Sequence, residues 1–203
     1  MKKLGFNLAI MGMITAGKDT QANILKKDYA LKPIKTGVYS RNLLKEKSTN
    51  GDWARRTVGL GKPLPVILMK EFLIKEISKK TKNQDLLFVG GPRLKPEAQL
   101  VKKLMDEKKQ NLFVLYITLP DKEVYKRTMG RASGEMKAVH KMLDEKHLID
   151  PRIKYHKEQV SKTVKYFEKL GCLKKINGNQ PIDKVTKDIL NEIEKYKQKN
   201  DYL

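Results

Sequence analysis

The stretch from Leu4 to Leu31 constrains the fold more than any other part of the chain. Residues 4–11 form an apolar run that predicts a buried strand, and residues 18–31 have a helical pattern with Ile24 and Leu25 on the inner side. Between them lies Gly12–Lys18, a G-x-x-x-x-G-K sequence. In this context the glycines let the backbone curl so that its N–H groups face a phosphate chain, while the helix dipole and Lys18 add positive charge. A chance Gly-Lys turn is the alternative, and the flanking strand and helix disfavour it.

Apolar strands and helices alternate along the rest of the chain, which predicts a parallel sheet covered on both faces. We expect strands in 32–37, 85–93, 111–120 and 172–177, and helices at Lys95–Lys109, Asp121–Met129 and Ile182–Lys199. Helical periodicity over 39–80 is broken at 49–52 (TNGD) and 59–65 (GLGKPLP), and a second long helical region is interrupted at Pro151. Ligands of such sheets bind at the carboxyl ends of the strands. The residues expected there are Gly12–Thr20, Thr36–Arg41, Gly90–Arg93 and Asn177–Gln180.

The chain is strongly basic, with 44 Lys and Arg against 23 Asp and Glu and a formal charge of +21. Seven of the basic residues are arginines, so 44 − 7 = 37 are lysines. We interpret most lysines as solvated helix faces, because arginine is the residue that holds a phosphate at two points. Arg55 and Arg56 are expected to be merely solvated.

Several classes of protein are disfavoured by composition. The single cysteine, Cys172, excludes a disulfide framework and a cysteine zinc site, and suits a reducing, cytoplasmic setting. No run reaches membrane-spanning length, and the N-terminal apolar run continues into the Gly-Lys motif without a cleavage site. The three histidines, His140, His147 and His156, have no acidic or cysteine company, so we interpret them as surface or structural residues.

The motifs together resemble those of the adenylate kinase family in its short-lid form, over nearly the whole chain. GKDTQ at 17–21 resembles the family's Gly-Lys-Gly-Thr-Gln, and TGVYSR at 36–41 resembles its Thr-Gly-Asp-x-x-Arg. GKPLP at 61–65 resembles the segment at the acceptor base, and GGPR at 90–93 resembles Gly-Phe-Pro-Arg. LPDKEVYKRTMGR at 119–131 is similar to the family's Pro-Asp segment with two arginines, and NGNQP at 177–181 to the loop near the donor adenine.

This resemblance implies an α/β P-loop kinase fold in three layers, with a five-stranded parallel sheet flanked by helices. It implies a single domain over 1–203 that carries a helical monophosphate-binding insertion at about 37–65 and a short lid at about 131–140. The implied activity is phosphoryl transfer from ATP, with Mg, to a nucleoside monophosphate, AMP being the favoured acceptor. We expect a monomer with no membrane or nucleic-acid partner.

The resemblance also implies which residues act. The ATP-binding set is Gly12, Thr15, Ala16, Gly17, Lys18, Asp19, Thr20, Arg127 and Gln180. The monophosphate-binding set is Thr36, Gly37, Arg41, Leu64, Gly90, Arg93 and Glu97. Catalysis is assigned to Lys18, Arg93, Arg127, Arg131 and Arg152, which fits a reaction that depends on positioning and charge neutralisation.

Two acids that the family uses to organise the magnesium shell are replaced by Val38 and Val89, and an acid, Asp19, follows Lys18 where the family mostly has Gly. Asp19 is a candidate for holding the metal from the loop side. The alternative is that Asp19 caps the first helical turn and points to solvent.

The base-reading position also departs from the family. Where adenylate kinases have Gln, this chain has Glu97, whose carboxylate can only accept hydrogen bonds. Glu97 either reads the acceptor base or faces solvent at the start of its helix.

Two other classes of function stay open from the sequence. Val38 and Val89 favour a nucleotide-binding paralogue with little catalysis, against which the arginines and Lys18 are all present. The charge suggests a nucleic-acid-binding protein, but no aromatic-basic stretch of the kind that stacks bases is found. A gel-shift at low salt tests that alternative.

Overall fold

The computed structural model describes residues 1–132 and 146–200. Strands and helices alternate through these ranges, as the sequence predicts. The strands are β1 (Asn7–Gly12), β2 (Leu31–Lys35), β3 (Asp85–Val89), β4 (Leu112–Thr118) and β5 (Leu173–Asn177). The helices are α1 (Lys18–Asp28), α2 (Thr36–Leu43), α3 (Thr49–Thr57), α4 (Val66–Ser78), α5 (Lys95–Glu107), α6 (Asp121–Ala132), α8 (Lys146–Tyr155), α9 (Ser161–Lys169) and α10 (Ile182–Lys199).

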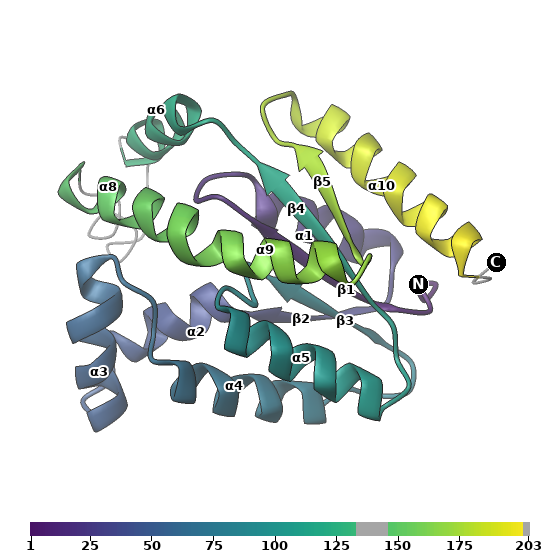
Figure 1. The fold of residues 1–203 in the computed structure, drawn as a ribbon, viewed down its shortest axis with the longest axis horizontal. Coiled ribbons are helices and arrows are strands. Elements are labelled where there is room, and N and C mark those ends of the chain that lie inside the picture. The colour runs from purple at the N-terminus through teal and green to yellow at the C-terminus, as the bar shows by residue number, and fades with distance from the viewer. Residues whose placement is uncertain (133–145, 201–203) are drawn as a thin grey trace.

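The described strands form one parallel sheet in the order β2-β3-β1-β4-β5 (Figure 1). β1 lies between β3 and β4, and all six of its residues are buried. A strand with covered neighbours and covered faces needs apolar side chains on both sides, which explains its continuous apolar run. The predicted α/β fold with five parallel strands is confirmed.

The two faces of the sheet are buried in separate cores. Leu8 and Ile10 of β1 pack in one core with residues of α1 and α10, and Ala9 and Met11 pack in the other with residues of α4, α5 and α9. Successive side chains of a strand point to opposite faces, so this alternation produces three layers. The layers bring the carboxyl ends of all five strands to one edge, from which the loops to α1, α2, α5, α6 and α10 start (Figure 1).

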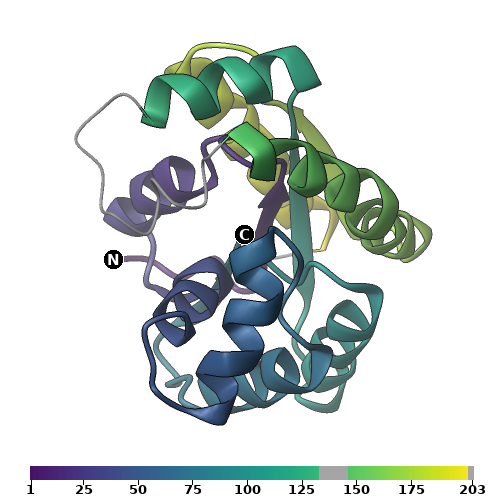
Figure 2. The same cartoon turned by 90° about the vertical axis from the view of Figure 1, so that its left-hand side faces the viewer.

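The region between β2 and β3 contains α2, α3, a 3₁₀ turn at Val58–Leu60 and α4. α2 and α3 lie on one side of the molecule and α6 and α8 on the other (Figure 2). The predicted break in this helical region occurs at 44–48 rather than at 49–52, because residues 49–52 begin α3. Ser48 is the N-cap of α3, and its hydroxyl accepts the Gly51 N–H at 3.1 Å, so the turn-forming residues belong to a helix start.

The predicted interruption at Pro151 is wrong. α8 continues through Pro151, and the irregularity is a π-helical turn at His156–Val160 that leads directly into α9. Ile149 and Ile153 of α8 pack in one core, whereas Val164 of α9 packs in the other. A π turn changes the phase of a helix by inserting a residue, which lets one long helical segment supply both cores.

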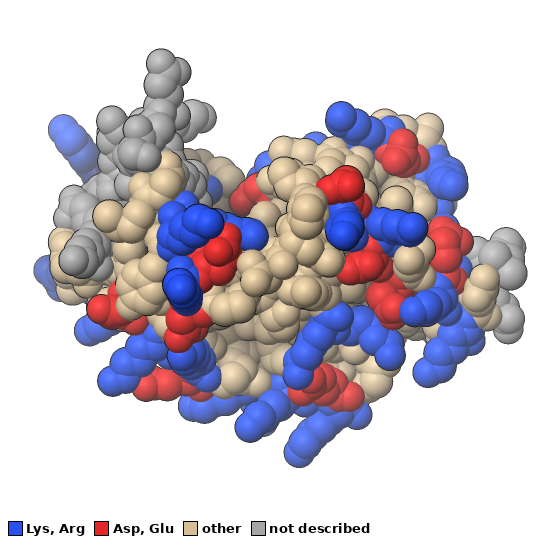
Figure 3. All heavy atoms as spheres, turned by 90° about the horizontal axis from the view of Figure 1, so that it is seen from above, with Lys and Arg blue, Asp and Glu red and all other residues tan. Residues whose placement is uncertain are grey.

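Basic and acidic side chains lie next to one another over the face seen in Figure 3. Many ion pairs of the described residues join side chains one helical turn apart, such as Lys79 with Glu76 at 2.5 Å and Lys195 with Glu192 at 2.6 Å. Such exposed pairs contribute little stability individually, and their value is mainly solubility.

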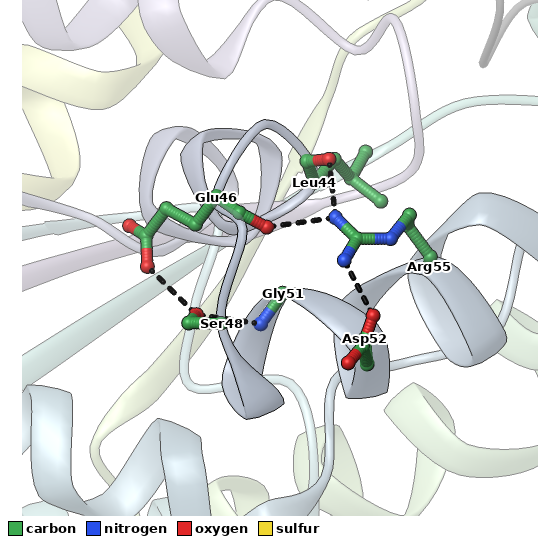
Figure 4. A network of polar contacts seen from close by, with 6 residues as sticks. All are labelled: Leu44, Glu46, Ser48, Gly51, Asp52 and Arg55. Carbon is green, nitrogen blue, oxygen red and sulfur yellow. Dashed lines mark hydrogen bonds and ion pairs between the residues drawn. The ribbon is translucent and has the colours of Figure 1, made fainter.

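Arg55 is not merely solvated, contrary to the prediction. Its Nη1 donates to the carbonyl oxygens of Leu44 at 3.1 Å and Glu46 at 2.8 Å, and its Nη2 contacts Asp52 at 2.6 Å (Figure 4). These carbonyls lie just past the end of α2, where helices leave acceptors unpaired. Arg55 therefore joins α3 to the end of α2, while Arg56 is exposed as expected.

Candidate active site

The glycine-rich loop wraps around the first turn of α1. Gly12 has φ +150°, and a Cβ on it would lie 2.4 Å from the Ile117 carbonyl oxygen of β4, so no other residue fits there. Gly17 has φ +82° and is the N-cap residue of α1. Thr15, with φ +56°, adopts the left-handed conformation without being glycine. This curl directs backbone N–H groups and a helix N-terminus toward one point, which is the usual arrangement for binding phosphate.

Lys18 is held over this loop, with its Nζ donating to the Met13 carbonyl oxygen. The same side chain approaches β3, because a Cβ on Gly90 would lie 3.8 Å from Lys18 Cε. The cation therefore lies between the loop after β1 and the loop after β3.

Two arginines, Arg41 of α2 and Arg93 of the loop after β3, converge at Gly37 in the first turn of α2. A Cβ on Gly37 would lie 3.2 Å from Arg41 Nη1 and 3.3 Å from Arg93 Nη2. Arg93 is oriented by its own loop, since its Nε donates to the Gly90 carbonyl oxygen at 2.8 Å. An anion between or beside two guanidinium groups this close would offset their repulsion, so the pair is suited to binding one.

Arg127 approaches the same region from α6. Its Nε donates to Glu123 Oε1 at 2.8 Å and its Nη2 to the Gly178 carbonyl oxygen at 3.1 Å. The hydrogen bond from Arg127 lowers the pKa of Glu123, so this carboxylate stays ionised and holds the guanidinium. The contact with Gly178 links α6 to the loop after β5.

Arg152 comes from α8 and lies against the loop after α3. A Cβ on Gly61 would lie 3.3 Å from Arg152 Cγ, and Gly61 has φ +72°. Glycine at 61 thus allows both the turn and the close approach of α8.

These residues line one cavity of about 320 Å³ at the carboxyl edge of the sheet. Its basic groups come from α1, the end of β2, α2, the loop after β3, α6 and α8, and Asp19 is the acid among its described lining residues. The lining residues are Ile14, Thr15, Gly17, Lys18, Asp19, Thr20, Lys35, Gly37, Val38, Arg41, Val89, Gly90, Arg93, Arg127 and Arg152. An electropositive cavity of this kind suits a polyphosphate rather than an uncharged ligand.

Comparisons with known proteins agree with this geometry. The sequence model described as "Adenylate kinase" matches residues 10–172, most of the chain. Three curated adenylate kinases are similar over most of their length. That of Azobacteroides pseudotrichonymphae is 27% identical over 93% of this chain and 97% of its own. That of Methanothrix thermoacetophila is 25% identical over 94% of this chain and 99% of its own. That of Leuconostoc mesenteroides is 28% identical over 90% of this chain and 94% of its own.

The chain belongs to the adenylate kinase family. Its members are phosphotransferases, so the protein is an enzyme of that class. No described helix is long and apolar enough to cross a membrane.

The valines that replace two family acids both line the cavity. Val38 is partly exposed there and Val89 is buried at the end of β3. Asp19 is exposed in the first turn of α1 and lines the same cavity. No cluster of three or more metal-binding side chains occurs in the described ranges. A lone cavity carboxylate fits an ion such as Mg²⁺ that keeps several waters and binds with substrate phosphates.

Glu97 does not face solvent, so that alternative is wrong. The residue is 2% exposed, and its Oε2 accepts the backbone N–H groups of Arg93 at 2.8 Å and Leu94 at 3.3 Å. Burial raises the pKa of this carboxyl, while the two hydrogen bonds and the Arg93 charge act in the opposite direction. Glu97 thus completes the start of α5, and a base-reading role stays a prediction.

The remaining predicted residues fall at different places. Ala16 and Thr36 are buried beside the cavity, and the Thr36 hydroxyl lies 3.4 Å from the Val89 carbonyl oxygen. Leu64 is buried in the core with α4, and Gln180 donates to Asp188 Oδ2 at 2.6 Å at the start of α10. Arg131 lies in the last turn of α6, and its side chain is outside the described part of the structure. Residues 133–140 of the predicted lid, which include His140, are also outside it.

Sequence reasoning missed Lys35, Tyr155 and His156, all of which line cavities at this edge. Tyr155 and His156 follow Arg152 by three and four residues, so helical spacing alone puts them on the same face. The expectation of a helix interrupted at Pro151 concealed that relation. Lys35 ends β2 at the carboxyl edge, the position that predicts a ligand contact.

Proposed function

We propose that this protein is a nucleoside monophosphate kinase that reversibly transfers a phosphoryl group from ATP to a nucleoside monophosphate, with AMP the favoured acceptor. The observation that supports this most is the convergence of Lys18, Arg41, Arg93, Arg127 and Arg152 on one cavity next to the glycine-rich loop. These side chains come from five separate segments, and no structural need of the fold explains their meeting. The family relatives are named adenylate kinases, which favours AMP.

In this proposal the donor lies on the loop side. The backbone of Gly12–Thr20 surrounds the phosphates of ATP, and the predicted contacts are Gly12, Thr15, Ala16, Gly17, Lys18, Asp19 and Thr20. Arg127 reaches the same phosphates from α6, and Gln180 lies near the donor adenine. The Glu123 contact keeps the Arg127 guanidinium in place before substrate arrives.

The acceptor lies on the α2 side. Arg41 and Arg93 hold its phosphate, and the remaining predicted contacts are Thr36, Gly37, Leu64, Gly90 and Glu97. An acceptor phosphate oxygen attacks the γ-phosphorus of ATP, the bond to the β–γ bridging oxygen breaks, and two diphosphates result. Lys18, Arg93, Arg127, Arg131 and Arg152 stabilise the charge on the group in transfer.

The proposed metal is magnesium that arrives with ATP. Asp19 would hold it from the loop side through its carboxylate or a bound water. When bound, Mg²⁺ neutralises charge on the transferring phosphates. Residue 19 supplies the acid that positions 38 and 89 lack.

Residues 37–65 are proposed as the monophosphate-binding insertion and 131–140 as a short lid in a single kinase domain. Closure of both over the nucleotides would exclude water, which otherwise accepts the phosphoryl group. The contact of Arg152 with Gly61 supports an approach of the two sides.

A coupled assay of diphosphate formation tests the proposal. ATP is combined with AMP, CMP, UMP, GMP or dTMP, with and without Mg²⁺. Magnesium-dependent turnover that is fastest with AMP is the expected result, and preference for another monophosphate would correct the acceptor. Absence of turnover with all five would favour the second candidate, a nucleotide-binding paralogue, for which Val38 and Val89 in the cavity are the specific observation.

Replacing Asp19 tests its role directly. We expect Asp19→Asn to lower kcat by roughly tenfold and to raise the Mg²⁺ concentration needed for half-maximal rate, since an amide binds the ion more weakly than a carboxylate. Asp28→Asn, which makes the same change at an exposed acid at the other end of α1, is the control. If Asp19→Asn changes neither the rate nor the magnesium requirement, Asp19 does not hold the metal and acts only as an acid at the start of α1.

A further inference from the structure

A second, narrow cavity of about 70 Å³ adjoins the main one. The two share Ile14, Gly37, Arg41, Arg93 and Arg152, and the second extends toward α8 and the loop after α3. Because the two cavities share these lining residues, a small group of a ligand in the main cavity can extend into the second one.

Two residues that line this cavity each carry a buried polar atom with no hydrogen-bond partner among the described residues. These atoms are the Tyr155 hydroxyl and His156 Nδ1, both inaccessible to solvent. His156 as a whole is 7% exposed. The centroids of the two rings lie 5.7 Å apart in an edge-to-face arrangement, which gives neither polar atom a hydrogen bond. Leaving such atoms unpaired costs stability, and structures that keep them usually have a functional reason.

The backbone supports the same conclusion. Tyr155 is the last residue of α8 and His156 the first of the π turn. Single π turns inside helices occur frequently at functional sites, because the inserted residue redirects the side chains around it. Here Tyr155 and His156, at the junction of α8 and the π turn, line the same cavity as Arg41, Arg93 and Arg152.

The surroundings are electropositive. Burial lowers the pKa of His156, and the charges of Lys18, Arg93 and Arg152 lower it further, so its imidazole is neutral and carries one N–H. Burial raises the pKa of the Tyr155 hydroxyl, which therefore keeps its proton. Two uncharged donors behind three guanidinium groups match an anion with several acceptor oxygens, which is a phosphate monoester.

We propose that the Tyr155 hydroxyl and the His156 Nδ1–H donate hydrogen bonds to the acceptor monophosphate's phosphate group and so complete the shell that Arg41, Arg93 and Arg152 begin. This inference rests on the proposed function. The pair orients the acceptor's phosphate for attack, and the neutral donors add contacts without adding charge to an already cationic site.

Three variants separate the contributions. Tyr155→Phe removes only a hydroxyl, and His156→Leu removes the ring nitrogens. His156→Asn is the matched rescue, because its amide nitrogen takes the position of Nδ1. Equilibrium binding of AMP, adenosine and ATP is measured by calorimetry on each full-length protein, with melting temperature as the check on folding and ADP formation measured in the same preparations.

We expect AMP affinity to fall by roughly tenfold in Tyr155→Phe and in His156→Leu, the effect of losing one hydrogen bond to a charged group. His156→Asn should bind AMP within about twofold of wild type, and ATP and adenosine affinities should stay within about twofold in all variants. AMP affinity unchanged in Tyr155→Phe and His156→Leu would overturn the inference. A tenfold loss for adenosine as well would also overturn it, because the contact would then be to the nucleoside.

The proposed function fails separately. If the wild-type protein forms no ADP but the Tyr155→Phe and His156→Leu variants bind AMP more weakly than wild type, the phosphate contact stands and the kinase assignment does not. If it forms ADP and the variants bind AMP as wild type does, the kinase assignment stands and the contact does not. Wild-type protein that binds no AMP overturns both.

Discussion

At the scale of single residues, hydrogen bonds to backbone groups or to oppositely charged side chains fix the positions of the charged side chains in the site. Arg93 donates to the carbonyl of its own loop, Arg127 is held by Glu123, and Glu97 accepts the N–H groups that start α5. Each partner reduces the freedom of a charged side chain before any ligand binds. Preorganised charge is the main source of rate in a reaction that needs little covalent work from the protein.

Glu97 makes a prediction about pH. Its pKa is raised in the folded protein, so the native state holds more protons than the unfolded state between the ordinary pKa of 4.5 and the raised one. Its contribution to stability is therefore greatest at low pH and falls as pH rises through the raised pKa. We expect the free energy of unfolding of wild type, relative to Glu97→Gln, to increase from pH 7 to pH 5 in urea titrations.

Glu97→Ala is the companion variant. It removes the acceptor for the Arg93 and Leu94 N–H groups, so it should be less stable than Glu97→Gln by about 1 kcal/mol at pH 7. Equal stability of the two variants would mean that the carboxylate does not act as the cap of α5.

Glu123 makes a prediction about activity. Glu123→Gln keeps the size of the side chain but weakens its hold on Arg127, so kcat should fall by roughly three- to tenfold while the melting temperature changes little. Lys122→Gln, on the same helix, is the control and should leave kcat unchanged. A wild-type kcat in Glu123→Gln would show that the Gly178 carbonyl alone holds Arg127.

At the scale of elements, two helical segments differ from their sequence pattern for a common reason. Residues 49–52 begin α3 because Ser48 caps them, and the irregularity of the α8–α9 segment lies at the π turn because its two ends pack in different cores. Turn-forming residues and prolines indicate local preference, and packing decides whether a helix starts, continues or shifts its phase.

Arg55 tests the joint between α2 and α3. Arg55→Ala should lower the free energy of unfolding by about 1 kcal/mol, less than a buried contact would, because the side chain is 43% exposed. The matched control Arg56→Ala should change it by less than about 0.5 kcal/mol. If denaturant titrations give both variants the same free energy of unfolding, the Arg55 contacts do not stabilise the fold.

At the scale of the whole molecule, the charge of +21 is spread over the surface as well as gathered in the cavity. Self-repulsion destabilises a compact state with so much charge of one sign, and salt screens it. We expect the melting temperature to rise by roughly 2–4 °C between 20 and 300 mM NaCl. Chloride is the salt of choice because sulfate can bind the phosphate site. A melting temperature that falls would mean that the many surface ion pairs outweigh the repulsion.

The sequence by itself determined the class of fold and the centre of the site. The strand, the glycine-rich loop and Lys18 are contiguous, so their geometry follows from local conformation, and alternating apolar strands and helices leave a covered parallel sheet as the outcome. Arg93 follows the end of β3, and Arg41 and Arg127 lie in the helices that follow β2 and β4, which is why their meeting was predictable.

The tertiary structure decided what depends on packing between distant segments. Whether Glu97 is buried or exposed depends on how α5 meets its neighbours, and the role of Arg55 depends on where α2 ends. Helical spacing puts Tyr155 and His156 near Arg152, but whether they share a cavity with Arg41 and Arg93 depends on how α8 packs against α2 and the loop after β3. Local propensity carries no information about such contacts, since their free energy comes from residues far away in the chain.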